Sequence, residues 1–197
     1  VDVQPKAGAA NPDGLPPITP NEFFYVYQQR DPPNTDLYSV DDWQMEIRIR
    51  GEAVATMDTR FFENHTPIEL EHTLQCIGGN PRNTLINNAV WGGLPFDEVL
   101  AELGVSIPGS TIELKMQGAD RAGDTGRYTT AIPIEDVTEG RVWLMWEMNG
   151  EPMPFDHGAP CRFIVQGRYG TKNVKWPEHV DFIDEPHLGY WETRNWS

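Results

Sequence analysis

The sequence has few cysteines, few basic residues and no long apolar run. Only 2 of its 197 residues are cysteine, which is too few for a disulfide scaffold. Lys and Arg number 15 against 30 Asp and Glu, and the resulting formal charge of −15 would repel nucleic acids and anionic membrane surfaces. No segment approaches the roughly 20 apolar residues of a transmembrane helix. We therefore expect a soluble protein that neither inserts into a membrane nor binds nucleic acid.

The rest of the composition fits one compact folded unit. Hydrophobic residues make up 39% of the chain and include 7 Trp, enough for a substantial core. Residues 1–20 instead contain five prolines and two glycines without apolar periodicity, which indicates an extended arm. The sequence shows no internal repeat and no linker that would separate two domains. We therefore expect an N-terminal arm over residues 1–17 and a single domain over residues 18–197.

Short strands dominate the hydrophobic pattern. Residues 43–50 (WQMEIRIR) alternate apolar and charged side chains up to Gly51, as a half-buried strand does, and residues 111–116 (TIELKM) repeat this alternation. The aromatic run at 23–27 predicts a buried strand, and residues 141–148 predict an apolar strand or helix. Many short strands with few helices predict an α+β protein with mixed sheets.

One helix is clearly signalled. Gly92 and Gly93 are expected to break the chain, and Pro95 is then placed to begin a helix whose apolar residues fall on one face. Gly104 stands where the C-terminal cap of that helix belongs.

Residues 73–82 (TLQCIGGNPR) present a thiol at a turn. An apolar run leads to Cys76, and the following glycines let a bulky group approach the main chain beside the fixed positive charge of Arg82. Thiolate sulfur is a soft metal ligand. Two alternatives stay open, because Cys76 is equally an ordinary buried thiol or half of a disulfide with Cys161, the only other cysteine.

Two further stretches gather cationic groups. Residues 156–162 (DHGAPCR) place His157 and Arg162 on either side of a Gly/Pro turn, and residues 170–176 (GTKNVKW) add Lys172 and Lys175. Together these side chains form a candidate pocket for a phosphate-bearing ligand. The alternative is structural, with a histidine that caps a turn and lysines that are solvated at the surface.

Several motifs occur in the order found in one known family. They are TPNEFF, TLQC with its glycine turn, WGGLPFDEVL, RYTTAIP, MNGEPMPFDHGAPCR and GTKNVKW, and they span residues 18–196. This succession resembles the molybdopterin-binding domain of the sulfite oxidase family, including bacterial relatives and periplasmic methionine-sulfoxide reductases. The resemblance implies an α+β fold with curved, mixed β-sheets around a buried molybdenum cofactor, Mo-molybdopterin.

The resemblance also assigns roles by position. Cys76 matches the cysteine whose thiolate ligates molybdenum, Tyr128 matches the active-site tyrosine, and Arg82 and Trp91 match residues of the substrate pocket. The positions implied to bind the cofactor are Tyr25, Val26, Tyr27, Gln28, Gln29, Asp120, His157, Arg162, Asn173, Val174 and Lys175. The metal would carry out two-electron oxygen-atom transfer on a small molecule.

One departure from the family concerns the substrate. Sulfite oxidases usually carry Arg-Asn-His where this chain has Tyr27, Gln28 and Gln29, and that arginine helps to bind sulfite. We therefore expect a small, less charged sulfur compound as substrate rather than sulfite. The alternatives are an S-oxide reductase of the same fold and a non-catalytic domain that has lost the metal.

The electron partner and the location are implied in the same way. The chain contains no Cys-x-x-Cys-His haem motif, so we expect electrons to be exchanged with a separate cytochrome or haem protein. A chain that begins with Val1 rather than Met fits removal of an export signal, and the family implies a periplasmic enzyme.

Overall fold

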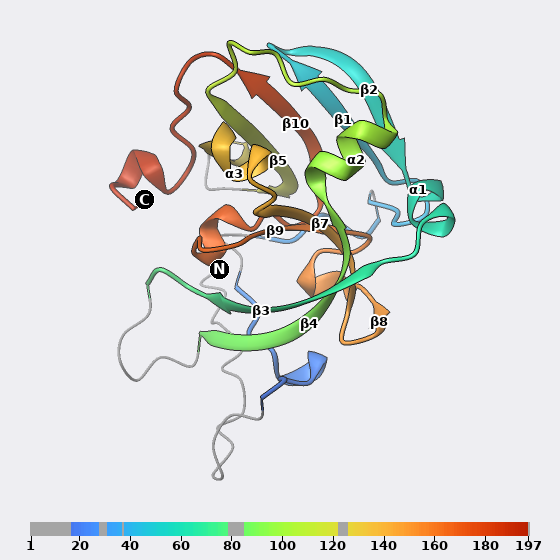
Figure 1. Ribbon diagram of the computed structural model, residues 1–197. Coiled ribbons are helices and arrows are strands. Elements are labelled where there is room, and N and C mark those ends of the chain that lie inside the picture. Colours follow the sequence, from blue (N-terminus) through green and yellow to red (C-terminus); the bar gives the residue numbers. More distant parts are fainter. Residues whose placement is uncertain (1–16, 28–30, 37, 79–84, 122–125, 197) are drawn as a thin grey trace.

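The computed structural model describes residues 17–27, 31–36, 38–78, 85–121 and 126–196. Within these residues the chain forms ten strands, three short α-helices and four 3₁₀ helices, so the predicted α+β class with few helices is confirmed (Figure 1). None of the described helices is long and apolar enough to cross a membrane. The predicted division into an arm and a single domain stays a prediction, because residues 1–16 lie outside the described part.

The first sheet is mixed. Its strands follow the order β2 (Glu52–Asp58), β1 (Gln44–Ile49), β10 (Pro177–Ile183), β5 (Glu113–Arg121) and β6 (Arg127–Pro133). β1 and β10 run parallel, and the other neighbours run antiparallel. Arg50 and Gly51 join β1 to β2, and both have the positive φ that a tight two-residue hairpin requires. The alternating pattern at 43–50 therefore predicted its strand correctly.

The second sheet curves beneath the first in Figure 1. Its strands follow the order β3 (Ile68–Gln75), β4 (Ile86–Pro95), β7 (Val142–Met148) and β8 (Glu151–Pro152), with β9 (Arg162–Val165) also paired to β7. The helices are α1 (Arg60–Asn64), α2 (Phe96–Glu102), α3 (Ile134–Thr138) and the 3₁₀ helices η1 (Asn21–Phe23), η2 (Phe155–His157), η3 (Gly170–Lys172) and η4 (Glu192–Arg194). Pro95 and Gly104 bound α2 as predicted, and Gly104 has the positive φ of a C-terminal cap.

Apolar side chains pack on both faces of the second sheet. On β7, Leu144 and Trp146 belong to the larger hydrophobic cluster between the sheets, whereas Met145 and Met148 belong to a second cluster on the opposite side. Because both faces of β7 are buried, its first five residues (VWLMW) are all apolar and show no alternation. This explains why the pattern at 141–148 could not distinguish a strand from a helix.

The expectation that Gly92 and Gly93 break the chain is wrong. Both glycines lie inside β4, where the pairing with β7 shifts register. A Cβ on Gly93 would lie 2.1 Å from the carbonyl oxygen of Leu144, and one on Gly92 would lie 2.9 Å from the side chain of Glu147. Glycine is needed here because the neighbouring strand approaches closely, and the chain does not turn.

The buried aromatic strand expected at 23–27 is also wrong. Pro20 opens the 3₁₀ helix η1, and the chain then continues outside any named strand. Phe24 and Tyr25 are buried all the same, and the backbone N–H of Tyr25 donates to Asn87 Oδ1 on β4 at 2.8 Å. The segment is therefore tied to β4 by a backbone-to-side-chain hydrogen bond and is not itself a strand.

Candidate functional site

Cys76 lies where β3 leaves its sheet. Its backbone N–H donates to the carbonyl of Leu85 at 3.0 Å, so pairing with the β4 side continues just beyond the last residue of β3. Its side chain is half-buried, whereas the neighbouring Leu74 is buried in the core. Cys76 and Cys161 are both free thiols, which removes the disulfide alternative.

A cavity of about 300 Å³ opens beside Cys76. Its lining contains most of the side chains that the sequence singled out, namely Tyr25, Val26, Tyr27, Cys76, Asp120, Tyr128, His157, Arg162, Asn173, Val174 and Lys175. These residues come from the N-terminal segment, the end of β3, the β5–β6 pair and the loops around β9. The fold therefore brings distant parts of the sequence to one cavity, while the role of each residue stays a prediction.

The remaining sequence candidates are placed differently. Gln28, Gln29 and Arg82 lie outside the described residues. Trp91 is fully buried on β4 and lies behind the cavity wall, where its ring centroid is 5.1 Å from the guanidinium carbon of Arg162. This cation–π contact fits a residue that supports Arg162 from behind, and contact of Trp91 with substrate stays a prediction.

Arg162 carries a buried positive charge into the cavity. Its Nη1 donates to the carbonyl of His157 at 3.1 Å, and its Nη2 donates to the carbonyl of Asn173 at 3.2 Å. Burial lowers the pKa of the guanidinium to about 10, so it stays charged at neutral pH. Its Nε is buried and has no hydrogen-bond partner among the described residues, so this N–H is unpaired within that part of the chain.

Lys175 and Asp120 also line the cavity, and each affects the pKa of the other. Burial, and then the charge of Arg162, lowers the pKa of Lys175 to about 7, while its Nζ donates to the carbonyl of Asp156 at 2.9 Å. Burial raises the pKa of Asp120 to about 6, against the opposing effect of Lys175. Asp120 Oδ1 is buried and accepts no hydrogen bond within the described structure. A ligand could therefore find both a donor and an acceptor at this wall.

A glycine brings the His157 loop close to these charges. Gly158 has φ +120°, and a Cβ there would lie 3.1 Å from Lys175 Cβ and 3.2 Å from Arg162 Cβ. The Nε2 of His157 lies 3.2 Å from the carbonyl oxygen of Asn21. Burial, and then the charge of Arg162, lowers the pKa of His157 to about 4, so this imidazole is neutral at pH 7 and donates through Nε2.

Tyr128 is fixed on the far side of the cavity. Its hydroxyl donates to the carbonyl of Thr171 at 2.5 Å, and burial raises the pKa of the phenol well above its ordinary value. The hydroxyl therefore keeps its proton at neutral pH, and because that proton is donated to Thr171, the oxygen is left to accept a hydrogen bond from a ligand.

Sequence reasoning missed part of the cavity wall. Thr171, Trp191 and Trp196 also line the cavity, and Lys172, which had been grouped with the other cations, does not. The dense aromatic content of residues 190–196 (YWETRNW) was the available signal, since such residues rarely cluster without a packing or binding partner.

This cavity fits the cofactor that the sequence resemblance implies. A pterin ring requires hydrogen-bond donors and acceptors, and the unpartnered Nε of Arg162 and Oδ1 of Asp120 offer one of each. Its phosphate requires cationic groups, which Arg162 and Lys175 supply, and its metal accepts a soft sulfur ligand such as Cys76. In the described parts of the chain, no group of three or more His, Cys, Asp or Glu side chains could hold a metal ion, so Cys76 stands there as a single thiol.

Curated proteins with similar sequences include sulfite oxidases and nitrate reductases. Human mitochondrial sulfite oxidase is 28% identical over 197 residues, which cover 91% of this chain and 36% of that protein. Sulfite oxidase of Arabidopsis thaliana is 31% identical over 163 residues, which cover 64% of this chain and 41% of that protein. Nitrate reductase [NADPH] of Emericella nidulans is 28% identical over 201 residues, which cover 94% of this chain and 23% of that protein. The chain thus spans well under half the length of these relatives.

A solved structure and a family profile complete the comparison. The sulfane dehydrogenase SoxCD from Paracoccus pantotrophus has a TM-score of 0.67 at 23% identity, covering 85% of this chain and 44% of that one, which establishes the curved-sheet fold. The profile described as the oxidoreductase molybdopterin binding domain matches residues 31–191. The chain therefore belongs to this family of molybdopterin-dependent oxidoreductases, and its cofactor is Mo-molybdopterin.

Proposed function

We propose that this chain is the catalytic domain of an enzyme that transfers an oxygen atom to or from a small sulfur-containing molecule, while two electrons move in the opposite direction. One observation carries the proposal: a single cavity exposes the thiol of Cys76 on one side and the buried cations Arg162 and Lys175 on another. The sulfite oxidases among its relatives support sulfur as the reacting element.

The residues of the chain would divide the work between holding the cofactor and orienting the substrate. When bound, the molybdenum cofactor supplies two-electron oxygen-atom transfer. Cys76 would serve as the protein's metal ligand, and Arg162 and Lys175 would hold the anionic end of the cofactor. Tyr128 keeps its proton and donates it to Thr171, so its hydroxyl oxygen would accept a hydrogen bond from a bound substrate. His157 is neutral and would support the loop that carries Arg162.

A second candidate within the same chemistry is reduction of an S-oxide. Trp191 and Trp196 add an aromatic wall to the cavity, and Tyr27 lies on the same lining. Aromatic side chains suit a substrate with an apolar portion better than a small dianion. A methionine-sulfoxide-type substrate would fit this description.

The electron partner would be a separate cytochrome or haem protein, and the location would be the periplasm. The formal charge of −15 supports a partner with a basic docking surface, because opposite charges accelerate encounter.

The decisive experiment combines metal analysis with a substrate screen. Protein produced in a host that makes molybdopterin should contain molybdenum near one equivalent and turn over sulfur compounds or S-oxides with redox dyes. Cys76→Ser should abolish turnover and leave the fold intact, because oxygen is a harder ligand than sulfur. Cys161→Ala is the control, since that thiol is fully buried and outside the cavity. Protein without molybdenum would instead indicate the non-catalytic binding domain.

A further inference from the structure

Residues 188–196, here called the C-terminal wall segment, close one side of the cavity. Trp191 and Trp196 reach the cavity lining from this segment. Its backbone lies against β6, where the N–H of Tyr190 donates to the carbonyl of Thr129 at 3.1 Å. A Cβ on Gly189 would lie 2.1 Å from that carbonyl oxygen, so only glycine allows this approach. Figure 1 shows this red end of the chain at the left edge of the molecule.

One carboxylate anchors the wall segment to the body of the protein. The side chain of Glu192 is only 9% exposed. Its Oε1 accepts a hydrogen bond from Thr130 Oγ1 at 2.6 Å and forms an ion pair with Lys172 Nζ. Lys172 Nζ also donates to Thr130 Oγ1 at 3.1 Å and to the carbonyl of Ala131 at 2.9 Å. Three elements, η3, β6 and η4, therefore meet at one buried ion pair.

The carboxylate of Glu192 is ionised at neutral pH. Burial alone would raise the pKa of Glu192, but the hydrogen bonds from Lys172 and Thr130 outweigh it and leave the pKa below its ordinary value. Exposed ion pairs contribute little to stability, whereas removing one partner of a buried pair leaves the other charge uncompensated.

The same anchor adjoins the hydroxyl of Tyr128. Thr171, which precedes Lys172 in η3, supplies the carbonyl that accepts the Tyr128 hydrogen bond. On β6, Tyr128 and Thr130 are two residues apart and so point to the same face of the strand. The Tyr128–Thr171 and Thr130–Lys172 hydrogen bonds are thus neighbouring contacts between β6 and η3. Glu192 binds both residues of the Thr130–Lys172 contact.

We propose that Glu192 is a positioning residue: by binding Lys172 and Thr130 it fixes Trp191 and Trp196 as the aromatic wall of the cavity and keeps Thr171 in place for Tyr128. Its effect on substrate rests on the proposed function, whereas its effect on the wall does not. Glu192 does not itself line the cavity, so it is a positioning residue that acts through the residues it holds.

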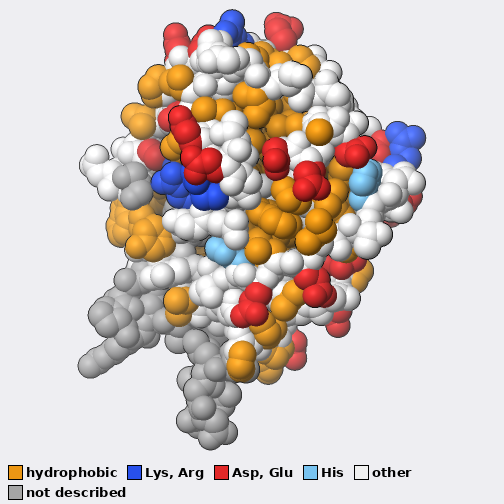
Figure 2. Space-filling model, viewed as in Figure 1, with side chains coloured by type: hydrophobic (Ala, Val, Ile, Leu, Met, Phe, Trp, Pro, Cys, Tyr) orange, Lys and Arg blue, Asp and Glu red, His pale blue; other side chains and the backbone are white. Residues whose placement is uncertain are grey.

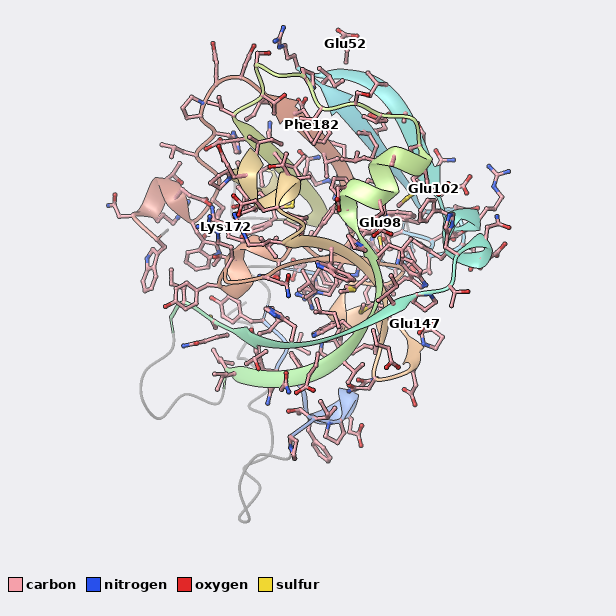
Figure 3. The ribbon with its side chains drawn as sticks, viewed as in Figure 1. Glu52, Glu98, Glu102, Glu147, Lys172 and Phe182 are labelled. Atoms are coloured by element: carbon pink, nitrogen blue, oxygen red, sulfur yellow. The ribbon has the colours of Figure 1, made fainter. Side chains whose placement is uncertain are left out.

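The matched comparison is Glu192→Gln against Glu52→Gln. Both substitutions remove one negative charge and keep the shape of the side chain. Glu52 is exposed at the start of β2, and Figure 3 shows it at the top of the molecule, well separated from Lys172. Hydrogen exchange, followed by mass spectrometry on the full chain, reports how tightly each segment is held.

In Glu192→Gln, the amides of residues 188–196 should exchange at least tenfold faster than in the parent, while those of β10 stay unchanged. Glu52→Gln should change neither segment. Lys172→Gln provides a second variant that should loosen the same residues if Glu192→Gln does not fold. An unchanged amide exchange rate at residues 188–196 in a folded variant, or an equal acceleration in β10, would show that Glu192 does not anchor the wall segment.

A kinetic measurement tests the positioning role separately. In molybdenum-loaded Glu192→Gln, the KM for the sulfur compound or S-oxide identified in the substrate screen should rise at least threefold. This rise should exceed the fall in kcat, because a loosened aromatic wall binds substrate less well. An unchanged KM would overturn the positioning role. Because the exchange experiment requires neither cofactor nor turnover, failure of the proposed function would show as missing molybdenum with the exchange result intact.

Discussion

Arg162 is the side chain on which the electrostatics of the cavity depend most. It is fully buried, it lies against the ring of Trp91, and its charge contributes to the lowered pKa values of Lys175, His157 and His72. Its two terminal nitrogens are occupied by backbone carbonyls, which fix the plane of the guanidinium. A ligand therefore meets a preoriented cation whose Nε has no hydrogen-bond partner among the described residues.

Replacing Arg162 with Ala should lower the cofactor content of the purified protein. A hydrogen bond to a charged group contributes about 1.5–3 kcal/mol, so cofactor affinity should fall about ten- to a hundredfold. Arg60→Ala is the control, because its side chain is 79% exposed and its ion pair with Asp58 lies at the surface. Molybdenum measured per mole of protein reports the result, and normal occupancy in Arg162→Ala would show that this cation does not hold the cofactor.

Asp120 should give the cofactor-free protein a distinctive pH dependence. Its pKa is about 6 in the folded chain against an ordinary value of 3.8, so the folded state binds more protons than the unfolded state between these values. Its contribution to stability is therefore largest below pH 4 and is lost as pH rises towards 6. Lys175, with a pKa of about 7, stays mainly charged across this window.

Urea unfolding at several pH values measures this contribution. The free energy of unfolding of Asp120→Asn should lack the component that the parent loses between pH 4 and pH 6. Asp97→Asn is the control, since Asp97 is an exposed residue of α2. An identical pH dependence in Asp120→Asn and the parent would contradict the raised pKa.

At the scale of elements, the pairing of β4 with β7 depends on Gly93. A methyl group there would overlap the carbonyl of Leu144, which is backbone and cannot rotate away. Gly93→Ala should therefore lower the free energy of unfolding by about 1–3 kcal/mol or more, as overpacking does. Gly109→Ala is the matched control, because a Cβ there meets nothing within 4 Å. Equal free energies of unfolding of the two variants in urea would show that β4 and β7 can move apart to accommodate the methyl group without loss of stability.

The elements that could be predicted from sequence are those with a single buried face. β1 alternates because only one of its faces is in the core, and α2 is bounded by Pro95 and Gly104. β9 was missed because it is four residues long and buried on both faces, so it has no period to detect. Gly92 and Gly93 were misread because close packing between strands and a chain break call for the same residue.

The candidate site was predictable where chemistry and motif coincide. Cys76, Arg162 and Lys175 could be singled out because sulfur and clustered cations have few uses in so acidic a chain. Thr171 was not predictable, since it takes part through its backbone carbonyl, which no side-chain pattern reveals. Trp91 carries a strong motif, yet only the fold shows that it lies behind Arg162.

At the scale of the whole molecule, net charge bears on which substrates the enzyme prefers. Acidic side chains predominate on the face shown in Figure 2, in keeping with the formal charge of −15. In the described lining of the cavity, Arg162 and Lys175 are the residues with cationic side chains other than histidine. Both are assigned here to the cofactor, so a dianionic substrate would meet a repulsive surface and, in that part of the lining, no further fixed cation.

We therefore expect sulfite to be a poor substrate compared with a neutral sulfur compound or S-oxide. An arginine contact to an anion contributes about 1.5–3 kcal/mol, so lack of one would lower kcat/KM for sulfite about ten- to a hundredfold. Raising ionic strength from about 0.01 to about 0.15 M shortens the screening length from about 30 to about 8 Å. This should raise kcat/KM for sulfite and leave that for methionine sulfoxide nearly constant. Efficient sulfite turnover that falls with added salt would instead reveal a cation at the substrate position, and the enzyme would then be a sulfite dehydrogenase.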